Sequence, residues 1–278
     1  MTCYNPLMES LSDFKNFLWV FLLGIAPAVF WMIYLYRKDK IEPEPRRLIF
    51  QIFLRGAVMV APAALLNMLL AFFYTLVFGL SLALVFGSKN IIYQSGIQIL
   101  SPYILYVLAA PMVEEYLKYY VLKRFIVSHP EFDEPMDGII YAAAVGLGFA
   151  AVENVIYLIN HFQSFNTTFF LRAVLSVPAH ALFTTITGYA LVQEKLGGNQ
   201  DVSLSVTKAL CLAMVAHALF NLAANVPVVG IVFLVGWVAF LWKRLNRSIR
   251  ISYADSPHLA EEFEQGSYSA KETEIDNE

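Results

Sequence analysis

Charged residues are scarce in this chain of 278 residues. Lys, Arg, Asp and Glu make up 15% of it, hydrophobic residues make up 58%, and the mean hydropathy is +0.59. An ordinary soluble domain is about one quarter charged, so this composition excludes such a domain and indicates a membrane protein. The net charge of -3 leaves no basic excess for binding nucleic acid, and we expect no nucleic-acid partner.

Cysteine is nearly absent, and internal repeats and low-complexity linkers are not evident. Cys3 lies near the N-terminus and Cys211 lies inside an apolar run, so the two are not expected to meet. This argues against a disulfide framework and a thiolate metal site. We expect one multi-pass membrane domain over residues 1–250, followed by an acidic, disordered cytoplasmic tail over residues 251–278.

The sequence does contain a succession of apolar runs, each long enough to cross a bilayer as a helix, which takes about 20 residues. The first run is too long, and too closely followed by others, to be a cleaved signal peptide. Pro62 is a candidate for a kink in the second run. We predict an all-α, polytopic membrane helix bundle of about seven transmembrane helices, near residues 17–36, 51–78, 101–122, 138–160, 170–192, 204–224 and 226–242.

Lys and Arg are concentrated in alternate loops, and this sets the orientation because cytoplasmic loops carry the excess of basic residues. The intervening loops contain little beyond Lys89 and Arg172. We therefore predict that the N-terminus lies outside and the C-terminus in the cytoplasm. The basic residues of the first, third and fifth loops and of the C-terminal flank are Arg37, Lys38, Lys40, Arg46, Arg47, Lys123, Arg124, Lys195, Lys243, Arg244, Arg247 and Arg250.

Four of the predicted spans carry polar or ionisable side chains in otherwise apolar sequence. An ionisable side chain at mid-bilayer costs about 2.5–3.5 kcal/mol on insertion scales, so such residues usually face one another inside a bundle and mark function. Counted from the span ends at about 1.5 Å per residue, one ionisable group from each of these spans falls within a slab that extends from the midplane into the outer half of the membrane. We predict one shared site, drawn from Glu114, Glu115, Lys118, Glu153, Asn154, His180, His217 and Asn221.

Helical spacing separates the two adjacent glutamates. Successive residues are about 100° apart around a helix, so Glu114 and Glu115 point in different directions. Lys118 follows them at spacings of four and three residues and is a neighbour of both. We assign Glu114 to the chemistry, and Glu115 with Lys118 to holding the site together. Pro111, one turn before Glu115, is expected to loosen the helix and help admit substrate or water.

Four motifs occur in order on successive spans. They are E-E-Y-L-K from Glu114, F-A-A-V-E-N ending at Asn154, the histidine of V-P-A-H-A-L-F, and H-A-L-F-N from His217. Together with the first-loop K-I-E-P-E-P-R-R, they resemble the PrsW family of bacterial intramembrane proteases, within the wider group of CAAX-processing and bacteriocin-processing membrane proteases. Most of that wider group carries a histidine where this chain has Glu153, and the Glu-Asn pair is similar to PrsW in particular.

The resemblance implies a protease of the bacterial cell (inner) membrane. It implies cleavage of a peptide bond within or near the bilayer, with single-span, anti-sigma-factor-like membrane proteins as the substrate class and site-1 type cleavage as the reaction. We expect the cut near the extracytoplasmic side, because the predicted site lies in the outer half of the membrane. The lipid bilayer and a membrane-protein substrate are the expected partners.

Peptide hydrolysis needs a base to activate water, a group to stabilise the oxyanion and an acid for the leaving amine. In one version, Glu153, His180 and His217 bind a catalytic zinc and leave one position open for water. In the metal-free version, which needs no cofactor, Glu114 activates water with one histidine, and His217 and Asn221 hold the oxyanion. Both versions stay open, with a preference for the metal. The candidate catalytic residues are Glu114, Glu115, Glu153, His180, His217 and Asn221.

Other functions are weighed beside this one. A CAAX-type or bacteriocin-maturation endopeptidase would differ in substrate rather than in motif. A proton-coupled transporter or channel also buries Glu and His near the midplane, but it would often show repeated halves, and none are evident. A non-catalytic relative would tolerate loss of a site residue, yet every motif position is filled. Ser176 and Cys211 lack the surroundings expected of a nucleophile.

Several residues are interpreted as structural. Asp137 and Gly138 form a helix-start signal. Gly146 and Gly148 are expected to let helices approach closely, as small residues do in membranes, and Asn154 is a candidate for an interhelical hydrogen bond.

Overall fold

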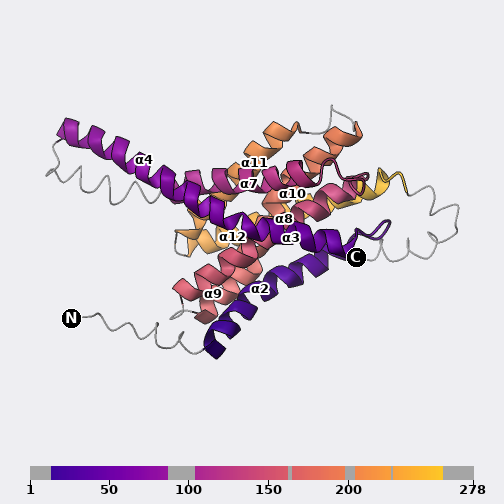
Figure 1. Cartoon of the computed structure of the whole chain (residues 1–278), viewed down its shortest axis with the longest axis horizontal. Helices are drawn as coiled ribbons and strands as arrows, with labels where there is room; N and C mark the ends of the chain where they lie inside the picture. The colour runs from indigo at the N-terminus through magenta and orange to yellow at the C-terminus, as the bar shows by residue number, and fades with distance from the viewer. Residues whose placement is uncertain (1–13, 87–103, 162–164, 198–203, 227, 259–278) are drawn as a thin grey trace.

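The computed structural model describes residues 14–86, 104–161, 165–197, 204–226 and 228–258, and within these ranges every regular element is a helix (Figure 1). The all-α prediction is therefore confirmed. Two short elements, η2 and η4, are single π-helical turns. In chain order the elements are α2 (Phe14–Tyr36), α3 (Arg46–Val58), α4 (Val60–Phe86), η2 (Leu105–Ala109), α7 (Ala110–Phe125), α8 (Pro135–Asn160), α9 (Phe165–Leu171), η4 (Arg172–Ser176), α10 (Val177–Leu196), α11 (Val206–Ala224) and α12 (Val229–Ala254).

The seven predicted spans correspond to α2, α3 with α4, η2 with α7, α8, α9 to α10, α11, and α12. Among the described residues, six of these segments are long and apolar enough to cross a membrane. The seventh, η2 with α7, falls short in apolarity because it contains Glu114, Glu115 and Lys118. Residues 101–103 of its predicted span lie outside the described ranges. The chain is thus a multi-pass membrane helix bundle, as predicted.

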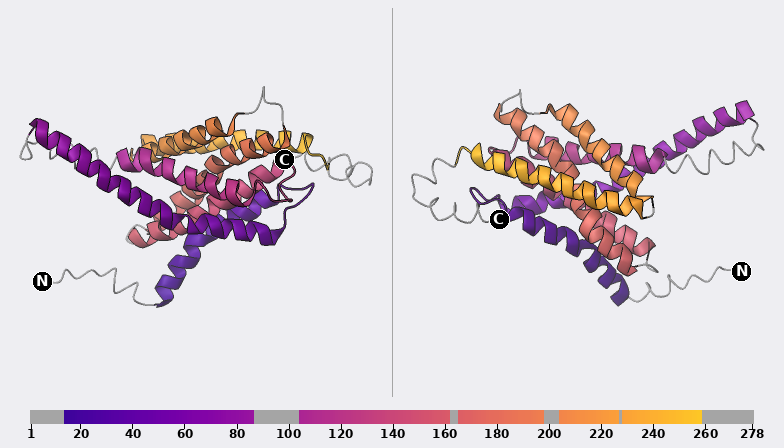
Figure 2. Two further views of the ribbon diagram at one scale, coloured as in Figure 1. Left: turned by 45° about the horizontal axis from the view of Figure 1, so that its top comes forward. Right: turned by 180° about the vertical axis from the view of Figure 1, so that it is seen from behind.

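The second segment begins earlier than predicted and is interrupted. It starts at Arg46 instead of residue 51, and the break between α3 and α4 falls at Met59. Pro62, the candidate for a kink, lies in the first turn of α4, where its missing N–H leaves the carbonyl of Val58 without its usual helical donor. Beyond this point α4 projects away from the other described helices, as both views of Figure 2 show.

Helix α8 lies at the centre of the bundle and packs against α2, α3 and α10. Glycines permit these close approaches, as predicted. A Cβ on Gly148 would overlap the carbonyl oxygen of Phe53 in α3, and a Cβ on Gly146 would lie 2.6 Å from the carbonyl oxygen of His180 in α10. Gly138 and Gly188 face each other in the same way. This packing fixes the depth of Glu153 relative to His180.

One end of the bundle is tied together by buried carboxyl groups. In the loop between α2 and α3, the Asp39 carboxylate accepts a hydrogen bond from the Glu44 N–H at 3.2 Å, and the Tyr141 hydroxyl of α8 donates to the Glu44 carboxylate. Asp137 accepts from the backbone N–H of Glu134 at 2.7 Å. This satisfies one of the free donors at the start of α8, so the helix-start interpretation of Asp137 is confirmed.

The chain after α12 meets the same end. The Ser256 hydroxyl donates to Glu134 at 2.6 Å, and His258 Nε2 lies 2.7 Å from Glu42. Helix α12 continues to Ala254, past the predicted domain boundary after residue 250. Residues 259–278 of the predicted tail lie outside the described ranges. The first loop, the third loop and the C-terminal segment thus share one end, as the predicted topology requires; which side of the membrane that end faces stays a prediction.

Burial changes the acidity of the carboxyl groups at this end of the bundle. Desolvation, aided by the nearby Glu134 carboxylate, raises the pKa of Asp39 from 3.8 to about 8. Desolvation also raises the pKa of Glu134 from 4.5 to about 7. The native state therefore keeps protons that the unfolded chain gives up. The resulting contribution to stability is complete below the unfolded pKa values and is lost as the pH rises through the native ones.

We predict that the protein loses thermal stability as the pH rises from about 6 to 8, and that Asp39→Asn reduces this loss. Asparagine keeps an oxygen that can accept from the Glu44 N–H but cannot ionise. The measurement is the midpoint of thermal unfolding of the purified protein across this pH range. Glu131→Gln, at an exposed position before α8, is the control and should keep the parent's slope. An unchanged slope in Asp39→Asn would contradict the prediction.

Candidate active site

Two π-helical turns lead into helices that carry site residues. Pro111 follows η2 and Pro178 follows η4. Proline lacks an N–H, so the carbonyls of Val107 and Val174, four residues earlier and inside the two turns, lose their usual helical partner. Wide turns of this kind occur frequently at functional sites. The loosening expected at Pro111 therefore takes the form of a π turn, and α10 has the same feature before His180.

Lys118 is the centre of the polar cluster. Its side chain is fully buried, and its ammonium nitrogen lies 2.7 Å from Glu115 Oε1, 2.9 Å from His180 Nδ1 and 4.0 Å from Glu114 Oε2. It also lies 4.5 Å from the centre of the Phe149 ring. These contacts join α7 to α8 and α10 inside the membrane region.

The two histidines lie side by side, with ring centres 5.0 Å apart. His217 Nδ1 is 3.0 Å from Glu115 Oε1, and its Nε2 is 3.9 Å from Glu114 Oε2. His180 Nε2 is 2.9 Å from Glu153 Oε2. The ionisable residues predicted to share one site therefore do so. Glu115 does more than pair with Lys118, because it also orients His217.

Arg172 is a member of the cluster that sequence reasoning missed. Its guanidinium donates to Glu153 Oε2 and to Asn154 Oδ1, each at 2.9 Å, and lies 3.8 Å from the centre of the Tyr157 ring. Asn154 in turn donates to the Gly24 carbonyl of α2 at 2.8 Å, as its interhelical assignment predicted. Arg172 was placed at a loop edge because the predicted span began at residue 170. The structure shows that the helical segment begins at Phe165, so Arg172 lies inside it. A single arginine within a largely apolar run was the sequence signal that could have identified it.

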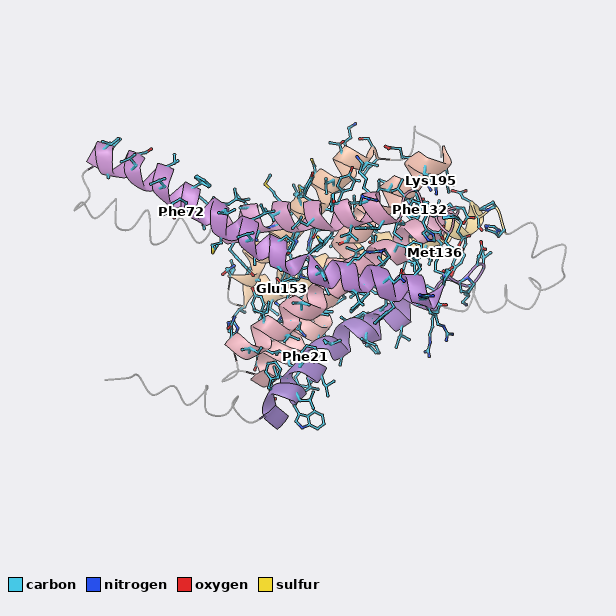
Figure 3. The ribbon with its side chains drawn as sticks, viewed as in Figure 1. Phe21, Phe72, Phe132, Met136, Glu153 and Lys195 are labelled. Atoms are coloured by element: carbon cyan, nitrogen blue, oxygen red, sulfur yellow. The ribbon has the colours of Figure 1, made fainter. Side chains whose placement is uncertain are left out.

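A cavity of about 640 Å³ opens onto the cluster. Glu114 is 7% exposed and is not among the residues that line this cavity, whereas its neighbour His217 is. In Figure 3 the Glu153 side chain lies among the crossing helices, away from the end of the bundle that carries Phe132, Met136 and Lys195. The polar lining of the cavity includes Tyr106, Glu153, Arg172, His180, His217 and Asn221.

Asn221 links this cavity to the first π turn. Its side-chain amide donates to the Tyr106 carbonyl of η2 at 3.1 Å. This carbonyl sits where the helical pattern is interrupted, so the contact satisfies a backbone acceptor. Ser176 also lines the cavity, whereas Cys211 is exposed on α11 and is not part of the lining.

The charges of the cluster do not cancel. Three carboxyl groups, Glu114, Glu115 and Glu153, face two basic side chains, Lys118 and Arg172. Charges buried without partners are costly. A proton on one of these groups, or a bound cation, would balance the remaining negative charge.

The residues fit a metal ion in donor type and in proximity. Ligand atoms of Glu114, His180 and His217 lie within 4.8 Å of one another, and Glu114 Oε2 is buried without a hydrogen-bond partner. A carboxylate behind a ligating histidine, as Glu115 is behind His217, is the usual support for such a ligand. Glu153, expected as the carboxylate ligand, is outside this compact group because Arg172 and His180 hold its carboxylate. Both nitrogens of His180 have partners in this arrangement, Lys118 and Glu153.

Matches between this chain and known proteins all lead to one family. Residues 44–243 match the model of a family described as PrsW family intramembrane metalloprotease. The chain is 34% identical to Protease PrsW of Oceanobacillus iheyensis over 198 residues, which cover 71% of this chain and 79% of that protein. It is 36% identical to Protease PrsW of Geobacillus kaustophilus over 166 residues, 60% of this chain and 62% of that one. For Protease PrsW of Bacillus subtilis the identity is 28% over 219 residues, 79% and 88% of the two chains. No solved structure matches.

We predict that Arg172→Gln lowers the rate of peptide cleavage by about 10–100-fold, the range typical of residues that hold a functional side chain in place. The substitution removes the bonds that fix Glu153 and Asn154. The measurement is the cleavage rate of a single-span reporter substrate in membranes, with the amount of folded enzyme determined by size-exclusion chromatography. Lys208→Gln, at an exposed position on α11, removes a charge elsewhere and should have no effect. A parental rate in folded Arg172→Gln would show that Glu153 does not need this support.

Proposed function

Because this chain belongs to the PrsW family of intramembrane proteases, we propose that it hydrolyses a peptide bond of a single-span membrane protein near the extracytoplasmic side of the bilayer. Membership makes it a membrane-embedded peptidase with a protein substrate in the membrane. The observation that carries the finer proposal is the buried cluster of Glu114, Lys118, His180 and His217 beside a cavity lined by polar groups.

Glu114 is the proposed water-activating residue. Its Oε2 has no hydrogen-bond partner, and its distance of 3.9 Å from His217 Nε2 is too long for a direct hydrogen bond. A water molecule can bridge two polar atoms across such a gap. In the proposed reaction, Glu114 takes a proton from this water while the water oxygen attacks the carbonyl carbon of the peptide bond. Glu114 then returns the proton to the leaving nitrogen, so that one water is consumed and the carboxyl and amino ends are released.

The remaining residues position these groups and stabilise charge. Glu115 and Lys118 hold His217 and His180 at fixed orientations. Arg172 holds Glu153 against His180. His217 and the amide of Asn221 line the cavity and are the proposed partners of the oxyanion. Donors fixed in place before the reaction need no costly reorganisation when negative charge develops.

A metal ion is the alternative source of activation. Glu114, His180 and His217 would hold a zinc ion, which supplies a Lewis acid that acidifies water and polarises a carbonyl. In that case Glu153 lies next to the ligand His180 and is the carboxylate available for proton transfer. The hydrogen bonds around His180 differ between the two versions, because a nitrogen that binds a metal cannot also accept a hydrogen bond from Lys118.

The substrate class rests on the resemblance and not on the geometry. Single-span, anti-sigma-factor-like proteins and site-1 type cleavage are what that resemblance implies. A CAAX-type or bacteriocin-maturation substrate is the runner-up, since the same site would serve it. The relatives named above are bacterial, which supports a location in the bacterial cell membrane.

We predict that Glu114→Gln, Glu153→Ala, His180→Ala and His217→Ala each reduce cleavage by at least about 100-fold, because general acid–base groups contribute roughly 10²–10⁴-fold. Glu115→Gln should retain more activity than Glu114→Gln, since an amide can still bond to His217. The measurement is product formation by folded, membrane-inserted variants, with exposed Glu194→Gln as the control. An active Glu114→Gln beside an inactive Glu115→Gln would reverse their assigned roles.

A separate measurement decides between the two versions of the chemistry. If a metal is used, elemental analysis of the purified active protein should find about one zinc per chain. Activity should then be lost to a chelator and restored by zinc, and His217→Ala should lower the zinc content. A fully active preparation that contains no metal would select Glu114 with its histidine as the complete catalytic machinery.

A further inference from the structure

A second cavity, of about 750 Å³, receives no lining residue from α4. Its walls come from α2, from the η4 turn with the start of α10, and from α12, which contact one another there. In the rear view of Figure 2, α12 and α2 flank the segment that contains α9. Only Leu175 is shared with the cavity of the candidate active site. The second cavity is therefore a separate groove.

The floor and one wall of this groove are apolar and aromatic. Trp31 and Trp242 have ring centres 5.2 Å apart, and Tyr34 lies 5.6 Å from Trp242. The Trp31 indole donates to the Ala173 carbonyl of η4 at 2.8 Å, which fixes the wall. The lining also includes exposed Val235 and other aliphatic side chains. A surface of this kind on a membrane helix bundle suits a hydrocarbon chain, and tryptophan and tyrosine favour the membrane–water boundary.

The charge of the groove has one sign. Lys38 and Lys40, from the loop after α2, and Lys243 and Arg250, from α12, all line it, and no carboxylate does. Lys243 and Arg250 are seven residues apart and so lie on one face of α12, about 10 Å apart along the helix. Both are exposed. Four basic side chains beside an apolar cleft provide binding groups for a phosphate attached to a hydrocarbon chain.

We propose that this groove binds an anionic phospholipid, with its phosphate at Lys243, Arg250 and the lysines of the first loop, and an acyl chain along the Trp31 and Trp242 wall. The bilayer is the source of a ligand with this combination of parts, and basic pockets between membrane helices are where anionic headgroups bind. An acyl chain in the groove packs against Leu175 in η4, the same π turn that carries Arg172.

Helix α12 offers an internal control for this proposal. Arg247 is basic and exposed, and it lies between Lys243 and Arg250 in the sequence, but it is not part of the groove. A general attraction between basic residues and an anionic membrane surface would involve Arg247 as much as its neighbours. A defined groove would not.

The first experiment measures retention of added phospholipid by the full-length protein, using native mass spectrometry with phosphatidylglycerol and phosphatidylcholine as the probes. The parent should retain phosphatidylglycerol in preference. The double variant Lys243→Gln/Arg250→Gln should weaken that binding by roughly tenfold or more, given the favourable contribution of each basic residue. The matched double variant Arg247→Gln/Lys208→Gln also removes two exposed charges and should change it by less than about twofold. Equal losses in the two double variants, or no preference between the lipids, would overturn the proposal.

A second pair of variants tests the apolar part without changing charge. Ala239→Phe places a ring in the groove and should reduce phosphatidylglycerol retention, whereas Val232→Phe, at an exposed position of α12 outside it, should not. Undiminished retention in folded Ala239→Phe would show that the lipid does not occupy the groove.

Discussion

The burial of Lys118 is the constraint on which the rest of the site depends. Its side chain has no exposed surface, so its ammonium group must find acceptors inside the bundle. Glu115 and His180 supply them at 2.7 and 2.9 Å. Removing one partner of a buried pair typically costs about 3–5 kcal/mol because the other charge stays behind. The helices that carry these groups are thereby held at one relative depth, and His217 is added to the same network through Glu115.

The packing of α8 makes this polar network possible in an apolar protein. Gly146 and Gly148 let α10 and α3 approach the backbone of α8 closely. Glu153 is carried on the same helix, five residues beyond Gly148, and meets both His180 and Arg172. The two π turns complete the arrangement, since each precedes a helix whose next turn contributes to the site. The candidate active centre is thus a set of charges held by helix packing, with a cavity that opens onto it.

The sequence predicted the bundle and most of the cluster because both depend on strong, local signals. Long apolar runs specify spans, and ionisable residues within them must find partners, so the convergence of Glu114, Glu153, His180 and His217 followed from energetic cost and depth. The separation of Glu114 from Glu115 followed from helical geometry.

What could not be predicted depends on tertiary contacts or on exact helix ends. Arg172 was placed at the edge of a loop because the predicted span began at residue 170, whereas the helical segment begins at Phe165. The second role of Glu115, at His217, required the position of α11. The compact group of Glu114 with the two histidines, in place of Glu153, reflects side-chain directions that spacing alone does not give. The break at Met59 and the continuation of α12 to Ala254 are boundary effects of the same kind.

The central claim is that the buried cluster hydrolyses a peptide bond inside the membrane. The most direct measurement is mass spectrometry of the products formed when the purified protein, in proteoliposomes made with ¹⁸O-labelled water, acts on a single-span substrate. The account predicts a cut within or at the outer edge of the substrate's membrane span, with ¹⁸O in the new carboxyl group and no product from Glu114→Gln. A cut in a water-exposed segment far from the span, or equal product from Glu114→Gln, would contradict it.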